Sequence, residues 1–319
     1  MHLSGFTMGT SYRVTLLSKP DHASLIHQQI EQKLKQINQL MSTYIDNSEL
    51  SRFNRSNAIT CQKISKDTYF VVKQAIEISK QTNGMFDVTI DPLISEWGFD
   101  RKQTNDQVPT QAKINQLLNQ IGYDKLALGE SCIQKQTPNI SVNLSAIAKG
   151  YAVDQIAELL INNEVKNYLV EIGGETASKG KNPKSEPWRL AIESPSLKQR
   201  QIQQIFNPLG FGVATSGDYR NYFEKHGIRF SHTIDPSTGK PITHKLASVT
   251  VLHKQTMLAD AYATSFMVMG TKKALEFAEK NKLAVFMIVK TKQGFDTIYS
   301  SQFEWHLVSN TTNQMKLYN

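Results

Sequence analysis

The sequence lacks a long hydrophobic run and contains only two cysteines. No stretch reaches the roughly 18–20 consecutive apolar residues of a membrane-spanning helix, and no signal peptide is visible. Cys61 and Cys132 do not have the spacing of a metal site. They could pair in an oxidising compartment or remain two thiols, and the sequence leaves both alternatives open.

Four motifs of common nucleotide-binding and hydrolytic enzymes are also absent. The sequence has no G-x-x-x-x-G-K-[ST] phosphate loop, no G-x-G-x-x-G fingerprint, no H-E-x-x-H and no G-x-S-x-G. These absences remove the usual nucleotide-binding and hydrolase interpretations.

The composition is that of a folded globular chain rather than a disordered one. Of its 319 residues, 39% are hydrophobic and 20% are charged. The net charge of +8 is spread along the chain, without an arginine-rich arm or a nucleic-acid module. We therefore expect no nucleic-acid partner, although a mild positive potential could favour an anionic small molecule.

Helical and strand-like patterns are mixed along the chain without a strict βαβ alternation. Apolar residues at helical spacing predict helices over 22–41, 67–84, 110–122, 146–165 and 257–281, with Asp67 as the N-cap of the second and a split near Gly270 in the last. Strands are predicted over 7–17, 125–145, 167–181, 188–195, 230–242, 246–253, 283–290 and 294–303, with strand and loop over 84–99 and a strand running into a short helix over 211–227. This order favours an α+β fold with mixed β-sheets and flanking helices. We expect one compact domain over 1–319 with its core in 3–310, and a polar surface excursion over 100–111.

The segment "VNLSAIAKGYAVD" (142–154) could bind an anion. A predicted strand ends at Asn143, and a helix is expected to begin near Ser145. Free backbone N–H groups at a helix start favour phosphate, and Lys149 adds a cation. An ordinary capped helix explains this segment equally simply, and taken alone the segment favours that explanation.

The segment "MLADAYATSF" places Asp260 and Thr264 four residues apart. On a helix their oxygens point the same way, and such a pair can bind a hard cation such as Mg²⁺. The alternative is that Asp260 faces water at a helix start and Thr264 has no special role.

Two further segments carry polar or aromatic groups. In "SHTIDPSTGKPI", His232 could act as a base near neutral pH, whereas Asp235 is best explained as closing a turn. Phe86, Asp87 and Trp97 could hold an aromatic ring system, although core packing is the more common role of a tryptophan. Gly173–Gly174 is first of all a tight turn, and Ser216 a helix N-cap.

The order of the motifs along the chain is a more specific signal than any single motif. "TMGTSY", "MSTYIDNSELSRFN", "GMFDVTIDPL", "NLSAIAKGYAVD", "LVEIGGE", "ATSGDYRNYF", "SHTIDPSTGKPI" and "ADAYATSFMVMG" resemble, in sequence order, the ApbE-type FAD:protein FMN transferases. The resemblance covers nearly the whole chain and implies a T-fold-related α+β fold. It also implies that FAD and Mg²⁺ are bound, that FMN is transferred to a threonine hydroxyl through a phosphoester, and that AMP is released.

The resemblance also implies roles for particular residues. Contacts to the flavin substrate would come from Met8, Tyr44, Met85, Phe86, Asp87, Asn143, Lys149 and Ile234. The Mg²⁺ ligands would be the Ala146 carbonyl, Asp260 and Thr264, and His232 would activate the acceptor hydroxyl. Asn143 stands where the family usually has Asp, which keeps hydrogen bonding but removes a charge.

The implied partner is a redox-complex subunit, associated with the membrane, that carries a Ser/Thr-Gly-Ala-Thr-like motif. Many family members are lipoproteins of the bacterial envelope, so we expect a periplasmic location at the inner membrane and an export or lipid-anchor segment upstream of Met1. Two other functions use the same residues. The protein could hydrolyse FAD to FMN and AMP as a pyrophosphatase, or bind FAD without chemistry.

Overall fold

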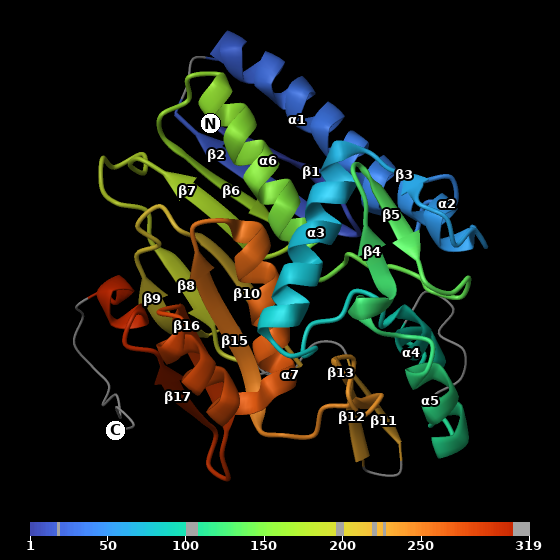
Figure 1. Cartoon of the computed structure of the whole chain (residues 1–319). Coiled ribbons are helices and arrows are strands. Elements are labelled where there is room, and N and C mark those ends of the chain that lie inside the picture. Colours follow the sequence, from blue (N-terminus) through green and yellow to red (C-terminus); the bar gives the residue numbers. More distant parts are fainter. Residues whose placement is uncertain (18–19, 100–107, 196–200, 219–221, 226–227, 309–319) are drawn as a thin grey trace. The chain divides into compact units, whose positions relative to one another are not determined.

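The computed structural model describes residues 1–17, 20–99, 108–195, 201–218, 222–225 and 228–308 (Figure 1). The chain packs as two compact units. Unit 1 contains 1–36, 149–219 and 245–319, and unit 2 contains 37–148 and 220–244. Most of the predicted surface excursion over 100–111 lies outside the described residues. The interpretation of 1–319 as one domain remains a prediction.

Unit 1 is built on an eight-stranded sheet in which every neighbouring pair is antiparallel. In spatial order its strands are β1 (His2–Thr7), β2 (Thr10–Leu16), β6 (Tyr168–Ile172), β7 (Glu175–Lys179), β10 (Gly212–Gly217), β15 (Leu246–His253), β16 (Ala284–Lys290) and β17 (Phe295–Tyr299). Helices and strands are therefore combined as the α+β prediction required.

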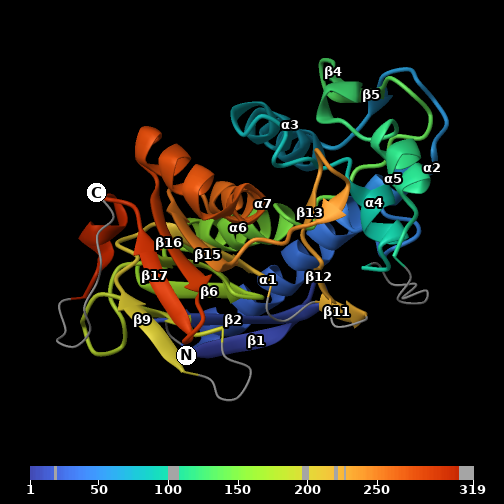
Figure 2. The ribbon, with the colours of Figure 1, turned by 90° about the horizontal axis from the view of Figure 1, so that it is seen from below.

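Helices cover one face of this sheet (Figures 1 and 2). They are α6 (Ala148–Asn162), α7 (Thr256–Lys280) and the part of α1 (Pro20–Met41) that belongs to unit 1. In α1, Ile26, Ile30 and Leu34 recur at helical spacing and are all buried. The predicted break in α7 is confirmed at Gly270, whose φ of 73° is a conformation that other residues adopt only with strain.

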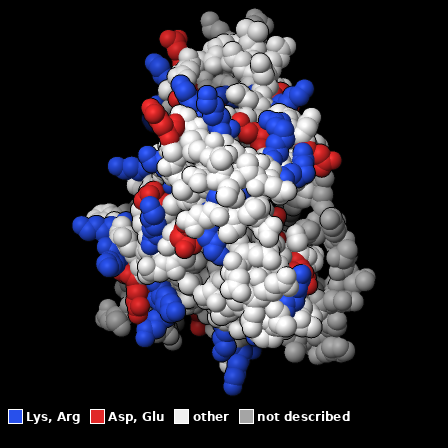
Figure 3. Space-filling view, turned by 45° about the vertical axis from the view of Figure 1, so that its right-hand side comes forward, with Lys and Arg blue, Asp and Glu red and all other residues white. Residues whose placement is uncertain are grey.

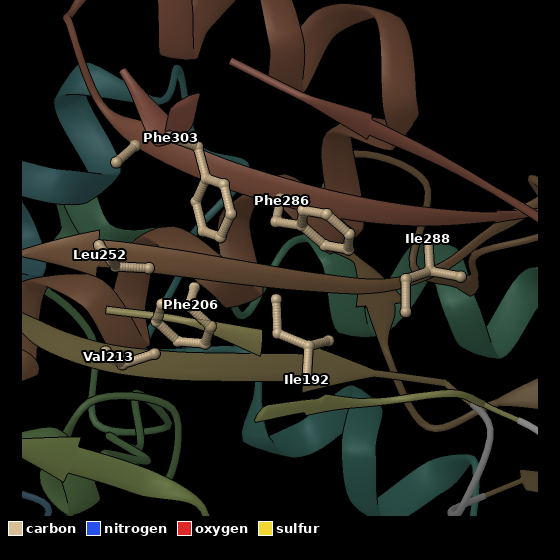
Figure 4. Packing of buried hydrophobic residues seen from close by; sticks show 8 residues of the cluster. Ile192, Phe206, Val213, Leu252, Phe286, Ile288 and Phe303 are labelled. Carbon is tan, nitrogen blue, oxygen red and sulfur yellow. The ribbon is translucent and has the colours of Figure 1, made fainter. Parts of the chain in front are cut away.

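The opposite face of the sheet is covered by a β-hairpin and a short 3₁₀ helix. The hairpin consists of β8 (Leu190–Glu193) and β9 (Ile202–Phe206), and η2 (Phe303–His306) follows the last strand. A cluster of apolar side chains from these elements and from β10, β15 and β16 fills the space (Figure 4): Ile192, Phe206, Val213, Leu252, Ala284, Phe286, Ile288 and Phe303. Since strand residues alternate between faces, Ser216 lies opposite to Val213, on the helix-covered face.

Unit 2 combines short helices with three small sheets. Its helices are α2 (Glu49–Arg55), α3 (Lys66–Gln81), α4 (Asp91–Glu96), α5 (Gln111–Leu118) and η1 (Tyr123–Lys125). Its strands are β3 (Gln62–Lys63), β4 (Leu126–Leu128), β5 (Cys132–Lys135), β11 (Tyr222–Lys225), β12 (Ile228–Ser231), β13 (Ile234–Asp235) and β14 (Lys240–Pro241). A disulfide joins Cys61 to Cys132 with a Cα–Cα distance of 5.4 Å, so of the two cysteine alternatives the paired one is present.

Trp97 belongs to the apolar core of unit 2, as the core-packing interpretation predicted. It is 4% exposed and packs with Leu93, Ile114 and Ile234. Its indole N–H donates to the Gly239 carbonyl at 2.8 Å. Its burial leaves Trp97 no free ring face in unit 2 for a flavin.

Several local predictions were wrong. The strand expected over 7–17 is divided, because Met8 and Gly9, both with positive φ, form the turn between β1 and β2. The segment 84–99 contains α4, in which Pro92 occupies the first turn. The predicted strand ending at Asn143 is absent, because residues 139–143 have no strand pairing among the described residues.

Two expected helix caps were also placed incorrectly. The Ser65 hydroxyl, not Asp67, accepts the capping hydrogen bond from Thr68 N–H at the start of α3. Ser216 caps no helix, because it lies inside β10. Residues 222–225, expected in a short helix, form β11 instead.

Candidate active site

Asp260 and Thr264 lie one turn apart in α7, in unit 1. Asp260 is 3% exposed, so the alternative in which it faces water is wrong. Thr264 is half-buried, and its Oγ1 lies 3.2 Å from the Ser216 hydroxyl of β10. The helix-covered face of the sheet therefore holds one carboxylate and two hydroxyls close together.

The surroundings of Asp260 leave part of its carboxylate available. Its Oδ2 accepts a hydrogen bond from the Gly150 backbone N–H at 3.1 Å, whereas no donor in the described part of the chain contacts Oδ1. Burial raises the pKa of Asp260, and the charge of Lys149 and the Gly150 hydrogen bond oppose this shift. A buried carboxylate with an unused oxygen suits a cation.

Lys149 forms its ion pair with Glu175, the first residue of β7. Burial lowers the pKa of Lys149, but the charges of Asp260 and Glu175 outweigh it, so the pKa is raised and the ammonium stays protonated. For Glu175, burial and then the charge of Asp260 raise the pKa to about 7, and Lys149 opposes this. Glu175 is 3% exposed, and its Oε2 has no hydrogen-bond partner.

A close approach between α6 and α7 fixes this group of side chains. A Cβ atom at Gly150 would lie 2.5 Å from the Thr256 carbonyl oxygen, so no larger residue fits there. Asp154, one turn further along α6, accepts hydrogen bonds from the backbone N–H groups of Thr256 (2.8 Å) and Met257 (2.9 Å). These bonds satisfy two of the donors that the start of α7 would otherwise leave unpaired.

The expectation of free N–H groups near Ser145 is corrected by this geometry. The helix begins at Ala148 rather than near Ser145, and the Ala148 N–H donates to Leu144 at 2.8 Å. The Gly150 N–H donates to Asp260. At these positions the start of α6 contacts protein acceptors rather than offering donors to an anion.

The predicted flavin contacts near Met85 lie in unit 2. Met85 is half-buried and Phe86 is buried. The Asp87 carboxylate accepts hydrogen bonds from the Thr89 N–H (2.8 Å), the Thr89 hydroxyl (2.6 Å) and the Tyr123 N–H (3.0 Å). Burial raises the pKa of Asp87, and these hydrogen bonds oppose the shift. In this structure Asp87 therefore stabilises its own loop.

Asn143, where the family resemblance led us to expect Asp, has two local partners. Its side-chain N–H donates to the Asp91 carboxylate at 2.7 Å, and its Oδ1 accepts from the Ser145 N–H at 2.9 Å. An ionised Asp at 143 could not donate to Asp91. The amide therefore matches a neighbouring carboxylate in this chain.

The remaining predicted site residues occupy turns and strand ends. His232 is half-buried, with the edge of its ring against Phe99 at a centroid distance of 6.5 Å. Ile234 is buried in β13. The Asp235 carboxylate accepts from the Ser237 N–H at 2.8 Å, which confirms that it closes a turn. Tyr44 is 50% exposed.

The predicted residues thus fall into two sets. Unit 1 contains Met8, Lys149, Asp260 and Thr264; unit 2 contains Tyr44, Met85, Phe86, Asp87, Asn143, Ala146, His232 and Ile234. The structure brings Lys149 and Asp260 together, with Thr264 one turn further along α7. Sequence reasoning missed Glu175 and Asp154, although "VEIGGE" and "AKGYAVD" had drawn attention to their segments.

The unit 1 residues fit a hard divalent cation. Among the residues that the structure describes, no group of three or more His, Cys, Asp or Glu side chains is placed so that it could hold a metal ion. A cation there would therefore use the free carboxylate oxygen of Asp260 and neighbouring hydroxyl or carbonyl oxygens, which are ligands that Mg²⁺ prefers together with water.

Two further observations concern the distribution of charge on the surface and the hydrophobicity of the helices. On the face shown in Figure 3, basic and acidic side chains are interspersed. In the described ranges, no helix combines the length and apolarity needed to cross a bilayer.

A buried group of carboxylates around one ammonium, held between helices and an antiparallel sheet, is typical of proteins that bind and process a charged ligand. The sequence profile of the ApbE family matches residues 8–287, and the chain belongs to this family. It is 45% identical over 306 residues to the FAD:protein FMN transferase of Vibrio cholerae, covering 95% of this chain and 92% of the relative. It is 38% identical to the FAD:protein FMN transferase of Escherichia coli, covering 96% and 89%.

Solved structures agree. The flavin transferase ApbE from Vibrio cholerae superposes with a TM-score of 0.90 at 42% identity, covering 96% of this chain and 99% of the other. The apo form of the Pseudomonas stutzeri flavinyl transferase ApbE gives a TM-score of 0.90 at 36% identity, covering 98% of each chain. The predicted family and the ApbE-like fold are confirmed.

Proposed function

We propose that this protein is an FAD:protein FMN transferase that joins FMN to a threonine hydroxyl of an acceptor protein. The observation that carries the proposal is the full-length similarity to enzymes of that name, combined with a buried Asp260 in the predicted position of α7. The acceptor would carry a Ser/Thr-Gly-Ala-Thr-like motif and belong to a membrane-associated redox complex.

In the proposed reaction the threonine oxygen attacks the FMN phosphorus of FAD. A phosphoester bond forms, the phosphoanhydride bond between the two halves of FAD breaks, and AMP leaves with the bonding electrons. The hydroxyl proton passes to a base of the protein. Excluding water decides between this transfer and hydrolysis of FAD.

In unit 1, Asp260 and Thr264 would hold Mg²⁺. When bound, Mg²⁺ supplies positive charge that offsets the charge developing on the leaving phosphate. Lys149 would add a fixed cation for the diphosphate. The buried carboxylate of Asp260, with no donor in the described part of the chain on Oδ1, supports this assignment.

In unit 2, we propose that His232 accepts the proton of the acceptor hydroxyl. A threonine hydroxyl is a poor nucleophile at neutral pH, and a base within hydrogen-bond reach contributes about 10²–10⁴-fold. We therefore expect His232→Ala to lower the transfer rate by about that factor while FAD binding, measured by flavin fluorescence, changes little. Equal losses in binding and transfer would argue against the role as base.

The direct test incubates the protein with FAD, Mg²⁺ and an acceptor that carries the threonine motif. Mass spectrometry of the acceptor should show the addition of FMN, and an acceptor with Thr→Val at the motif should remain unmodified. If free FMN and AMP appear and the acceptor mass is unchanged, the protein is a pyrophosphatase. If FAD remains intact, it is a flavin carrier.

We also propose a periplasmic location with a lipid anchor. The Cys61–Cys132 disulfide supports an oxidising compartment, because disulfides are rare in the reducing cytosol. Labelling with a thiol reagent before and after reduction, in protein taken directly from the cell, tests this. The proposal fails if both thiols react before reduction, or if the protein fractionates with the cytosol.

A further inference from the structure

Glu175 has no role in the proposed function, yet it lies within the buried charge cluster. It is 3% exposed, pairs with Lys149 through Oε1, and has no hydrogen-bond partner on Oε2. A carboxylate is rarely buried unless a charged group pairs with it, and for Glu175 that group is Lys149. The position of Glu175 at the start of β7, directly after the turn at Gly173 and Gly174, fixes it on the helix-covered face.

The charges of the cluster explain what Glu175 contributes. Lys149 is close enough to Asp260 for the two charges to influence each other, but its ion pair within the described residues is with Glu175. If Glu175 were uncharged, the nearest carboxylate for the Lys149 ammonium would be Asp260. The pair of Lys149 and Asp260 would then have no net charge, and the ammonium would repel a divalent cation at the Asp260 carboxylate.

We propose that Glu175 is a positioning residue that pairs with the Lys149 ammonium and so leaves the Asp260 carboxylate available to a divalent cation. With both carboxylates charged, the cluster of Lys149, Glu175 and Asp260 has one net negative charge, which favours the cation. This inference rests on the proposed function, because it takes Asp260 as the cation ligand.

The test measures metal binding rather than turnover. Mn²⁺ serves as the probe, added to the protein without FAD, and the electron paramagnetic resonance signal of free Mn²⁺ gives the dissociation constant. Glu175→Gln keeps the shape of the side chain and removes the charge, so the dissociation constant should rise at least about tenfold. The matched control is Glu171→Gln, which removes an exposed carboxylate from β6 of the same hairpin and should leave the constant unchanged.

A second substitution tests whether Glu175 acts by pairing with Lys149 or only supports the fold. Lys149→Met removes the competing ammonium, so the double variant Lys149→Met/Glu175→Gln should bind Mn²⁺ about as tightly as the parent protein. Thermal melting checks that each variant is folded. The inference is overturned if Glu175→Gln binds Mn²⁺ as the parent does, or if the double variant binds as weakly as Glu175→Gln.

Asp260→Asn distinguishes a failure of this inference from a failure of the proposed metal site. If the parent protein binds Mn²⁺ and Asp260→Asn does not, the metal site stands and the Glu175 variants decide the inference. If Asp260→Asn binds Mn²⁺ as the parent does, or the parent does not bind it, the metal assignment and this inference both fall.

Discussion

Asn143, at a position where the family resemblance led us to expect Asp, shows how one residue fits its neighbours in this chain. Its amide donates to the Asp91 carboxylate at 2.7 Å. The sequence alone indicated only that a charge is missing, because the partner lies 52 residues away, at the start of α4. The fold thus explains the uncharged side chain at position 143, because its amide donates a hydrogen bond to a carboxylate.

Asn143→Asp should destabilise the protein by about 1–3 kcal/mol at pH 8, because it places two carboxylates in contact. Part of this loss should be recovered at pH 5, since the two carboxylates can then share a proton. Urea unfolding at both pH values measures the effect. The exposed substitution Asn115→Asp in α5 is the control, and equal losses in the two variants would contradict this account.

The buried His306 makes the free energy of unfolding depend on pH. It is 5% exposed, its Nδ1 lies 2.8 Å from the Asn207 carbonyl oxygen, and its ring packs edge-on against Phe211. Burial lowers its pKa below the usual 6.5, and the hydrogen bond to Asn207 opposes this shift. The unfolded chain therefore binds the proton more tightly than the folded one.

Because the folded-state pKa is depressed, the contribution of His306 is complete above pH 6.5 and is lost as the pH falls through the folded-state value. His306→Phe should cost about 1 kcal/mol at pH 8 through the lost hydrogen bond, and should reduce the decline in unfolding free energy towards pH 5. The control replaces the exposed His2 by Gln. An unchanged pH dependence in His306→Phe would refute the assignment.

At the scale of elements, the junction of α6 with α7 determines where Asp260 lies. Gly150 allows the two helices to touch, Asp154 bonds the first N–H groups of α7, and the Gly150 N–H bonds Asp260 itself. The register between two helices far apart in the sequence is thus fixed by three local contacts. The charged cluster depends on that register.

Gly150→Ala should therefore disturb the site as well as the fold. Its Cβ would lie 2.5 Å from the Thr256 carbonyl oxygen and 2.6 Å from the Met257 Cα, so one helix must shift. We expect a loss of about 1–3 kcal/mol and weaker Mn²⁺ binding. The comparison is Ala157→Gly in α6, which should cost about 0.5–1 kcal/mol through helix propensity and leave Mn²⁺ binding intact. Normal stability in Gly150→Ala would show that the contact is not tight.

Elements with a clear apolar period were predictable, and those determined by distant partners were not. The spacing of Ile26, Ile30 and Leu34 in α1 is visible in the sequence, and so is the break at Gly270. The segment around Ser216 combines small and polar residues that also start helices. Pairing of β10 with β7 and β15 makes it a strand, and those partners lie elsewhere in the chain.

The two kinds of signal also differ within the candidate site. The spacing of four between Asp260 and Thr264 is visible in the sequence, whereas the ion pair of Glu175 involves a lysine 26 residues earlier and was missed. The burial of charge cannot be read from a single sequence, since it depends on which elements pack together.

At the scale of the whole molecule, two compact units each contribute a set of the family's motif residues. Unit 1 contains the charged cluster with the predicted contacts Met8 and Lys149, whereas unit 2 contains His232 and the other predicted flavin contacts. The central claim is that the buried Asp260 is required for transfer of FMN from FAD to a protein hydroxyl.

The most direct measurement is the mass of a threonine-motif acceptor after incubation with FAD, Mg²⁺ and either the parent protein or Asp260→Asn. The account predicts the FMN mass gain with the parent and, with Asp260→Asn, a loss of initial rate of at least about a hundredfold, while thermal melting shows that the variant is folded. An Asp260→Asn protein that modifies the acceptor at the parent rate would contradict the account.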